Sequence, residues 1–212
     1  MGRLYFKLED WYALAEILPR LRKSTQVKPA TLEKWTTRVH KEALDKAVDA
    51  EVLDHAWKAV PRPLKSDITL QESYYQGLIR AGLDDRAEKE LVAALKTDWR
   101  APLVRLFGLV DATDTTKQLK RAEGWLKTHG DDADLLLAAA RLCLRNELWG
   151  KARSYLETVI SMRPTPEAYQ EYGALLAQMG EGDAAADAYR DGLGMVAAEP
   201  LTAIPHMDAD KQ

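Results

Sequence analysis

The side chains that could carry out acid–base or metal chemistry are few in this sequence and lie far apart along it. Zinc-protease sites place two histidines on one helix face through spacings such as HxxH or HExxH. No such spacing relates the four histidines, His40, His55, His129 and His206. The chain also has no glycine-rich phosphate loop and no nucleophile-elbow motif. We therefore predict no catalytic residue and no metal site, and we expect a protein that is not an enzyme.

The composition excludes several broad classes of function. Lysine and arginine total 30 against 33 acidic residues, a net charge of −3 that gives no general attraction for nucleic acid. The single cysteine, Cys143, excludes an intrachain disulfide, and we interpret it as a packed, inert thiol. The chain has no run of 18 apolar residues and no signal-peptide core, so we expect a soluble polypeptide.

Basic side chains at helical spacing are the strongest candidates for a binding site. Residues three or four positions apart share one face of a helix. The residues with this pattern on three predicted helices are Lys34, Arg38, Lys41, Gln76, Arg80, Arg141 and Arg145. Stacked helices would join them into a basic stripe for an acidic peptide or a C-terminal carboxylate, because arginine binds carboxylates through paired hydrogen bonds. The alternative is that they are ordinary solvated helix faces.

Tryptophans are a second set of candidate contacts. They are Trp11, Trp35, Trp57, Trp99, Trp125 and Trp149. Trp11, Trp35 and Trp149 fall on predicted core stripes, which favours a structural role. Trp57 lies near a predicted helix end and Trp99 at a turn, where a partly open ring could serve as an anchor for a partner.

A repeated helix pattern must position these side chains. Residues 133–164 and 166–193 share one order: an apolar helix-period run, a short break, a small residue, and a second such run. The small residues are Ala152 and Ala185, 33 positions apart. A period of about 34 residues is typical of tetratricopeptide (TPR) repeats, in which each helix pair buries its apolar face on a neighbour. We predict an all-α fold, a TPR-like right-handed solenoid of antiparallel helix hairpins.

The repeat pattern also predicts the domain organisation. The predicted helix pairs are 29–44 with 46–59, 68–81 with 84–96, 100–110 with 115–128, 132–146 with 148–162, and 166–179 with 182–196. They form a repeat domain over 28–196, followed by a flexible tail at 197–212. Residues 1–27 read as a truncated first repeat, because the predicted helix at 9–21 has too short a segment before it for a partner helix. Its apolar face would be open to water, so we expect that the chain was cut from a longer protein.

Three segments carry a resemblance to a known family. They are RLYFKLEDWYALAEILPRLRK, WLKTHGDDADLLLAAARLCLRNELWGKARSYLE and AYQEYGALLAQMGEGDAAADAYRDGL. In this order the chain resembles, over nearly its whole length, the C-terminal TPR region of the bacterial HemY family. The resemblance implies a protein of the bacterial inner membrane, anchored by two N-terminal helices that this sequence lacks, with the TPR region on the cytoplasmic side.

The same resemblance implies a role at a late step of protohaem biosynthesis. We expect a non-catalytic scaffold that binds other proteins, with haem-pathway enzymes as partners and no cofactor of its own. No dinucleotide-binding fingerprint connects the chain to the unrelated flavin-dependent oxidase that shares the family's name. The alternative is a carrier or chaperone that binds haem or porphyrin directly. Such a protein would use an axial ligand among the histidines or Cys143, and porphyrin propionates would suit the basic stripe equally.

Overall fold

The computed structural model describes residues 1–22 and 27–196 of the chain. In these residues the secondary structure is entirely helical, with twelve α-helices, one short 3-10 helix and no strand. The prediction of an all-α fold is therefore confirmed. The predicted tail at 197–212 lies outside the described residues.

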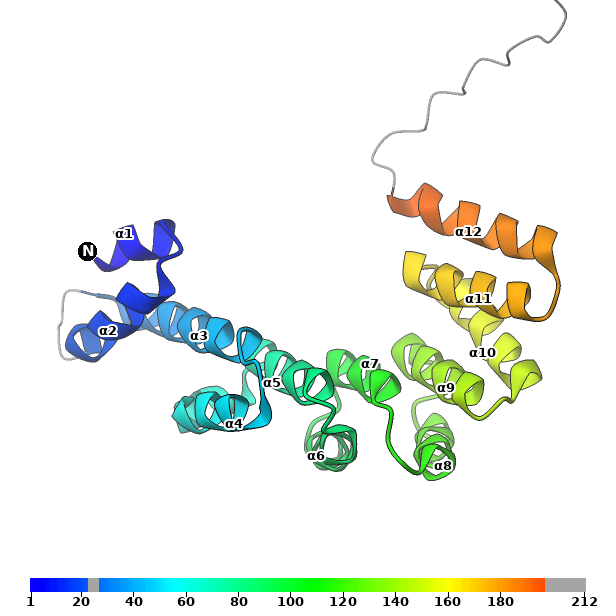
Figure 1. Ribbon diagram of the computed structural model, residues 1–212, viewed down its shortest axis with the longest axis horizontal. Coiled ribbons are helices and arrows are strands. Elements are labelled where there is room, and N and C mark those ends of the chain that lie inside the picture. Colours follow the sequence, from blue (N-terminus) through cyan, green and yellow to red (C-terminus); the bar gives the residue numbers. More distant parts are fainter. Residues whose placement is uncertain (23–26, 197–212) are drawn as a thin grey trace, which may run out of the picture. The chain divides into compact units, whose positions relative to one another are not determined.

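The helices fall into two compact units, each of which is described here by itself (Figure 1). The first unit, Met1–Asp114, contains α1 (Gly2–Lys7), α2 (Trp11–Arg22), α3 (Pro29–Asp45), α4 (Ala50–Ala59), the 3-10 helix η1 (Arg62–Ser66), α5 (Ile68–Arg80), α6 (Asp84–Thr97) and α7 (Ala101–Leu109). The second unit begins at Thr115 and contains α8 (Thr115–Leu126), α9 (Ala133–Arg145), α10 (Trp149–Met162), α11 (Pro166–Gln178) and α12 (Gly182–Val196). The boundary between the units falls inside the predicted repeat domain.

Consecutive helices pack against each other as hairpins within each unit. Four predicted pairs are found within a few residues of the expected bounds: α3 with α4, α5 with α6, α9 with α10, and α11 with α12. The helices predicted at 100–110 and 115–128 both form, as α7 and α8, but they belong to different units, so their pairing stays a prediction. Side-chain caps begin five of the described helices. Backbone N–H bonds are accepted at the starts of α2, α4, α5, α9 and α11 by Asp10, Asp49, Asp67, Asp132 and Thr165.

The same turn closes three of these hairpins. Each hairpin has a three-residue loop whose middle residue has a positive φ. These residues are Gly82, Glu147 and Gly180, with φ of 68°, 57° and 83° respectively. The residue after each of them donates its N–H to a carbonyl five positions back, at 2.9 Å, which is the closure of a Schellman motif. Glycine suits this left-handed conformation because it has no Cβ. The three hairpins therefore repeat one turn geometry as well as one helix pattern.

The N-terminal helices correct the expectation of an exposed face at 9–21. A helix at 2–7 was not predicted, yet α1 packs on α2, and α3 packs on α2 as well. Leu14 and Leu18 are buried together with Trp35, with 0%, 5% and 5% of their surfaces exposed. The missing N–H of Pro19 predicts a kink or an early end of α2; the early end does not occur, since the helix continues to Arg22.

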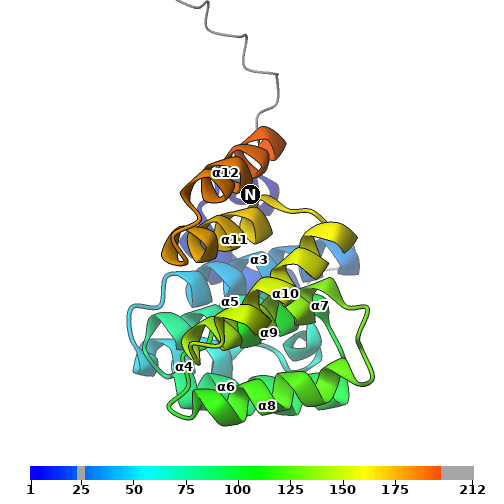
Figure 2. The same cartoon turned by 90° about the vertical axis from the view of Figure 1, so that its right-hand side faces the viewer.

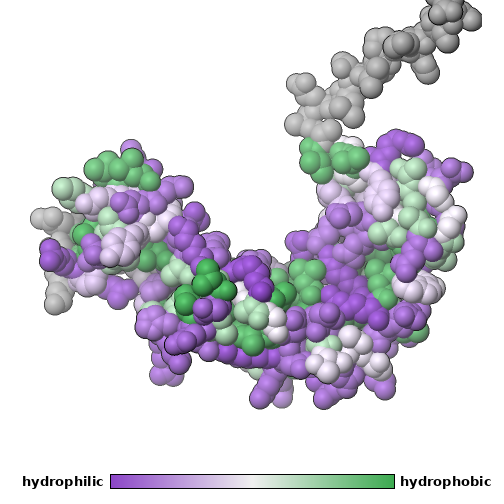
Figure 3. Space-filling model, in the orientation of Figure 1, coloured by the Kyte–Doolittle hydropathy of each residue, from purple (hydrophilic) through white to green (hydrophobic). Residues whose placement is uncertain are grey.

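The second unit is centred on α9, which is buried along almost its entire length. All residues from Ala133 to Cys143 are buried. The nearly continuous apolar run predicts this burial, because it is typical of a helix packed on more than one side. The last two helices, α11 and α12, lie side by side in both ribbon views (Figures 1 and 2). The end of α12 exposes Leu193 and Val196, where the surface is hydrophobic (Figure 3).

Burial of the small residues that open the second helices is confirmed. Ala152 and Ala185 have 0% and 3% of their surfaces exposed. Replacing Ala185 by leucine should overpack the contact between α11 and α12 and lower the free energy of unfolding by about 1–3 kcal/mol. Ala186→Leu is the matched control, because the neighbouring alanine is exposed and the same change there should have little effect. Urea unfolding followed by circular dichroism measures both. Equal stability of the two variants would contradict the packing described.

Candidate functional site

A groove on the first unit brings together three of the predicted site residues. Lys34, Arg38 and Lys41 lie along α3 and line a groove of about 490 Å³. Phe6 of α1 and the start of α5, at Asp67 and Thr69, complete its walls. We refer to this feature as the α3 groove. Here a predicted basic cluster coincides with a concave surface that α1, α3 and the start of α5 form.

The two cations at the start of the α3 groove rest on aromatic rings. The Nζ of Lys34 lies 5.6 Å from the centre of the Phe6 ring, and the guanidinium carbon of Arg38 lies 4.9 Å from that of Trp11. Phe6 in turn meets Trp11 edge to face at 5.5 Å and stacks on Trp35 at 6.2 Å. Cation–π contacts of this kind hold a charged side chain in one place without neutralising it. The aromatic cluster thus fixes α1 on α3 and fixes both cations.

The third cation of the groove has a partner within its own helix. Lys41 forms an ion pair with Asp45, one turn later on α3. Burial raises the pKa of Asp45, but hydrogen bonds from Lys41 and Ser73 and the charges of Lys41 and Arg80 outweigh it and lower that pKa. Arg80 reaches from α5 and donates to the carbonyls of Leu44 and Asp45 at 3.3 and 3.2 Å, which satisfies acceptors at the end of α3.

The remaining predicted residues of α5 and α9 have different environments. Gln76 is exposed on α5. On α9, Arg145 is half-buried, and its charge opposes the burial that raises the pKa of Glu171 on α11. Arg141 is buried, with 6% of its surface exposed. Because Arg141 and Arg145 belong to the second unit, a continuous stripe with α3 and α5 stays a prediction.

Arg141 requires a correction, since the structure gives it a partner inside the chain. Its Nη2 and Nε donate to Glu167 and Glu171 of α11, at 2.5 and 2.6 Å. The guanidinium therefore joins α9 to α11 and cannot also hold the carboxylate of a partner protein. Burial raises the pKa of Glu171, although the charge and hydrogen bond of Arg141 oppose this. The sequence pattern i, i+4 placed Arg141 with Arg145 on one face but could not show that two glutamates cover it.

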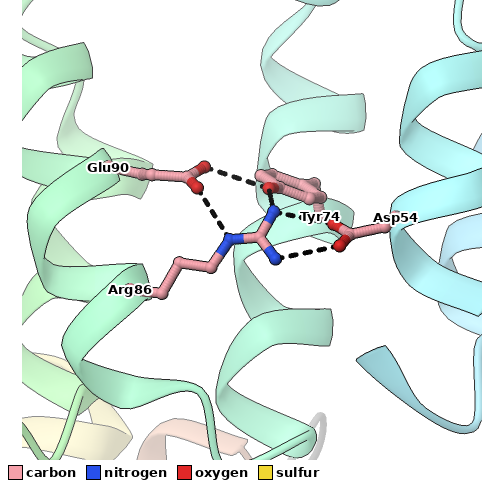
Figure 4. A network of polar contacts seen from close by, with 4 residues as sticks. All are labelled: Asp54, Tyr74, Arg86 and Glu90. Carbon is pink, nitrogen blue, oxygen red and sulfur yellow. Dashed lines mark hydrogen bonds and ion pairs between the residues drawn. The ribbon is translucent and has the colours of Figure 1, made fainter. Parts of the chain in front are cut away.

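A polar network that sequence reasoning missed connects three helices of the first unit (Figure 4). Arg86 of α6 donates two hydrogen bonds to Asp54 of α4, at 3.1 and 2.7 Å, and one to Glu90 at 2.8 Å. The hydroxyl of Tyr74, on α5, accepts from Arg86 at 2.8 Å and donates to Glu90 at 3.0 Å. Hydrogen bonds from Arg86 lower the pKa of Asp54. Each of the four side chains has a partner within the network, which is therefore best explained as a structural contact that holds α4, α5 and α6 together.

Trp57, one of the two predicted open anchors, has two neighbours within the first unit. The Trp57 ring stacks on Tyr74 with 4.3 Å between centroids and 11° between planes. The Nζ of Lys65 lies 5.2 Å from the centre of the same ring. The Trp57 ring is half-buried, and these two neighbours give it contacts inside the chain, so a role as an anchor for a partner stays a prediction. Trp99 is half-buried.

The candidate haem ligands are not grouped. Burial, and then the charge of Arg22, lower the pKa of His40, which is half-buried on α3. Cys143 is fully buried, and burial raises the pKa of its thiol to about 11, so it is not a thiolate at neutral pH. His55 is exposed and the Nδ1 of His129 lies 2.9 Å from Thr128 Oγ1. Within residues 1–22 and 27–196, no group of three or more histidine, cysteine, aspartate or glutamate side chains could hold a metal ion. His206 lies outside the described residues.

Comparison with known proteins gives no family for this chain. No protein-family model matches it, and a search of curated proteins returns no match. The resemblance to the HemY family therefore stays a prediction. Among the described helices, none is long and apolar enough to cross a membrane.

Proposed function

We propose that this protein is a non-catalytic interaction scaffold, a TPR-like right-handed solenoid of helix hairpins that binds other proteins. The observation that carries the proposal is the α3 groove, where Lys34 and Arg38 keep their charge and are held in place by aromatic rings. The repeated hairpins with one turn geometry support the TPR-like part of the proposal. A concave surface that carries fixed cations suits the recognition of a charged partner.

The resemblance to the HemY family supplies the biological setting of the proposal. We place the scaffold at a late step of protohaem biosynthesis, where it would hold haem-pathway enzymes together. In the family arrangement this region lies on the cytoplasmic side of the bacterial inner membrane, joined to N-terminal membrane helices. The net charge of −3 gives no reason to add nucleic acid to the partners.

The experiment that tests the scaffold is co-precipitation with purified partners. The immobilised chain is mixed separately with each enzyme of the last steps of haem synthesis, at about 50 and about 500 mM salt. We expect at least one enzyme to be retained, and less of it at high salt, because exposed charge contacts are screened. Retention of none of the enzymes would contradict the proposal.

Haem titration separates the scaffold from the alternative of a haem or porphyrin carrier. For a scaffold we expect weak binding whose absorbance spectrum does not change on substitution of His40, His55, His129 or Cys143. A carrier would give a stoichiometric shift of the Soret band that one of these substitutions abolishes. The burial of Cys143 is the observation that favours the first result.

A further inference from the structure

We propose that the α3 groove binds an internal acidic segment of a partner protein, with carboxylates on Lys34 and Arg38 and one apolar side chain against Phe6. This inference rests on the proposed function, because it takes the molecule bound in the groove to be a protein. It goes further by naming the groove, the chemistry of the segment and the residues that select it.

The spacing of the cations favours a segment over a single carboxylate. Lys34 and Arg38 are four residues apart on one helix, which corresponds to about 6 Å along its axis. An extended chain advances about 3.3 Å per residue, so two acidic residues in alternate positions of a partner would match this row of two cations. One terminal carboxylate could contact only one end of this row. Two acidic side chains along an internal segment match its length.

The charges in the groove remain available to a negatively charged occupant. In the described part of the chain, Lys34 and Arg38 meet aromatic rings and form no ion pair, whereas Lys41 is paired with Asp45. Of the two carboxylates that line the groove, Asp67 already accepts the N–H groups of Thr69 and Leu70. Glu33 is exposed and is the second negative charge in the lining. The lining therefore carries three cations against two carboxylates.

The aromatic cluster supplies both the fixed geometry and the apolar contact. Phe6 is half-buried, lines the groove, and contacts Lys34, Trp11 and Trp35. Side chains that are already ordered lose little conformational entropy when a partner binds. The open part of the Phe6 ring offers a surface for an aliphatic or aromatic side chain, which would distinguish the preferred segment from any other acidic sequence.

Fluorescence anisotropy with defined peptides tests the inference. The probe is a rhodamine-labelled peptide, Asp-Glu-Asp-Phe-Glu-Asp-Glu, amidated at its C-terminus so that no terminal carboxylate is present. Two further probes replace either its acidic residues by Gln and Asn or its Phe by Ser. We expect the first probe to bind most tightly and the neutral probe not to bind. Binding should weaken as salt is raised from about 50 to about 300 mM.

Matched variants of the full chain locate the site. Lys34→Gln with Arg38→Gln should weaken binding roughly tenfold. Lys89→Gln with Lys96→Gln removes the same charge from exposed positions on α6 and should leave affinity within about twofold. Glu33→Gln should strengthen binding, whereas Glu51→Gln on α4 should not. Loss of Arg38 could also loosen the aromatic cluster that holds α1. The Glu33 variant tests the groove without this effect, because it leaves Arg38 in place.

The results separate this inference from the proposed function. Equal loss of binding in the two double variants, no gain from Glu33→Gln, or no binding of the first probe up to about 1 mM would overturn the α3 groove as an acidic-segment site. A haem-pathway enzyme could still be retained in the co-precipitation, and the scaffold would then stand with another binding surface. Conversely, selective peptide binding without retention of any such enzyme would support the groove and contradict the proposed pathway.

Discussion

Replacing Tyr74 by alanine should lower the free energy of unfolding by about 3–5 kcal/mol, the largest effect we expect in the first unit. Tyr74 is 1% exposed, its ring stacks on Trp57, and its hydroxyl bonds to Arg86 and Glu90. The change removes the ring contact, leaves a cavity between α4, α5 and α6, and takes one member from the polar network. Chemical denaturation followed by circular dichroism measures the loss.

Two further substitutions divide this effect into its parts. Tyr74→Phe keeps the ring and removes only the hydroxyl, and because Arg86 and Glu90 retain each other as partners, it should cost about 1 kcal/mol. Tyr12→Ala makes the same large truncation at a residue that is 78% exposed, and stability should hardly change. If Tyr74→Ala lowered the free energy of unfolding no more than Tyr12→Ala, Tyr74 could not be the packed centre of this network.

The second large effect is expected at Arg141. Arg141→Met should destabilise the protein by about 3 kcal/mol, because it leaves Glu171 partly buried with its main counter-charge removed. Glu167 is about one third exposed and can be solvated, which keeps the loss below that of a fully buried pair. Adding Glu171→Leu to Arg141→Met should recover much of the stability, since an apolar pair removes the uncompensated charge. The control Arg190→Met breaks an exposed pair with Asp187 and should have little effect.

The loss in free energy of unfolding caused by Arg141→Met should depend on pH in a defined direction. Burial raises the pKa of Glu171, and removing Arg141 takes away the charge that opposes this rise. A glutamate with a raised folded-state pKa stabilises the fold when protonated, below its ordinary pKa of 4.5, and this contribution is lost as pH rises through the folded-state pKa. The difference between the variant and the original chain should therefore shrink as the pH falls from 7 toward 4.5. A loss in free energy of unfolding that grows as the pH falls would contradict this account.

The sequence by itself determined the helices and their turns, because these depend on neighbouring residues. Apolar positions at helical period predicted nearly the observed bounds of the helices from α3 to α12. The break before Ala152 and the glycine after α11 marked hairpin turns, which the left-handed backbone at Glu147 and Gly180 then formed. Burial of Ala152 and Ala185 also followed from their place in the repeat. In all these cases the cause lies within a few residues along the chain.

Only the tertiary structure decided which charged residues are available to a partner. Arg38 and Arg141 have the same pattern on their helices, yet Arg38 lies on the Trp11 ring in an open groove and Arg141 is buried by two glutamates. Those glutamates lie 26 and 30 residues further along the chain, beyond the reach of any local pattern. The helix α1 was missed for a similar reason. It has six residues, too few to show a helical period, and it is held by contacts of Phe6 with Trp11 and Trp35. The basic pattern could name candidates, but packing between distant segments selected among them.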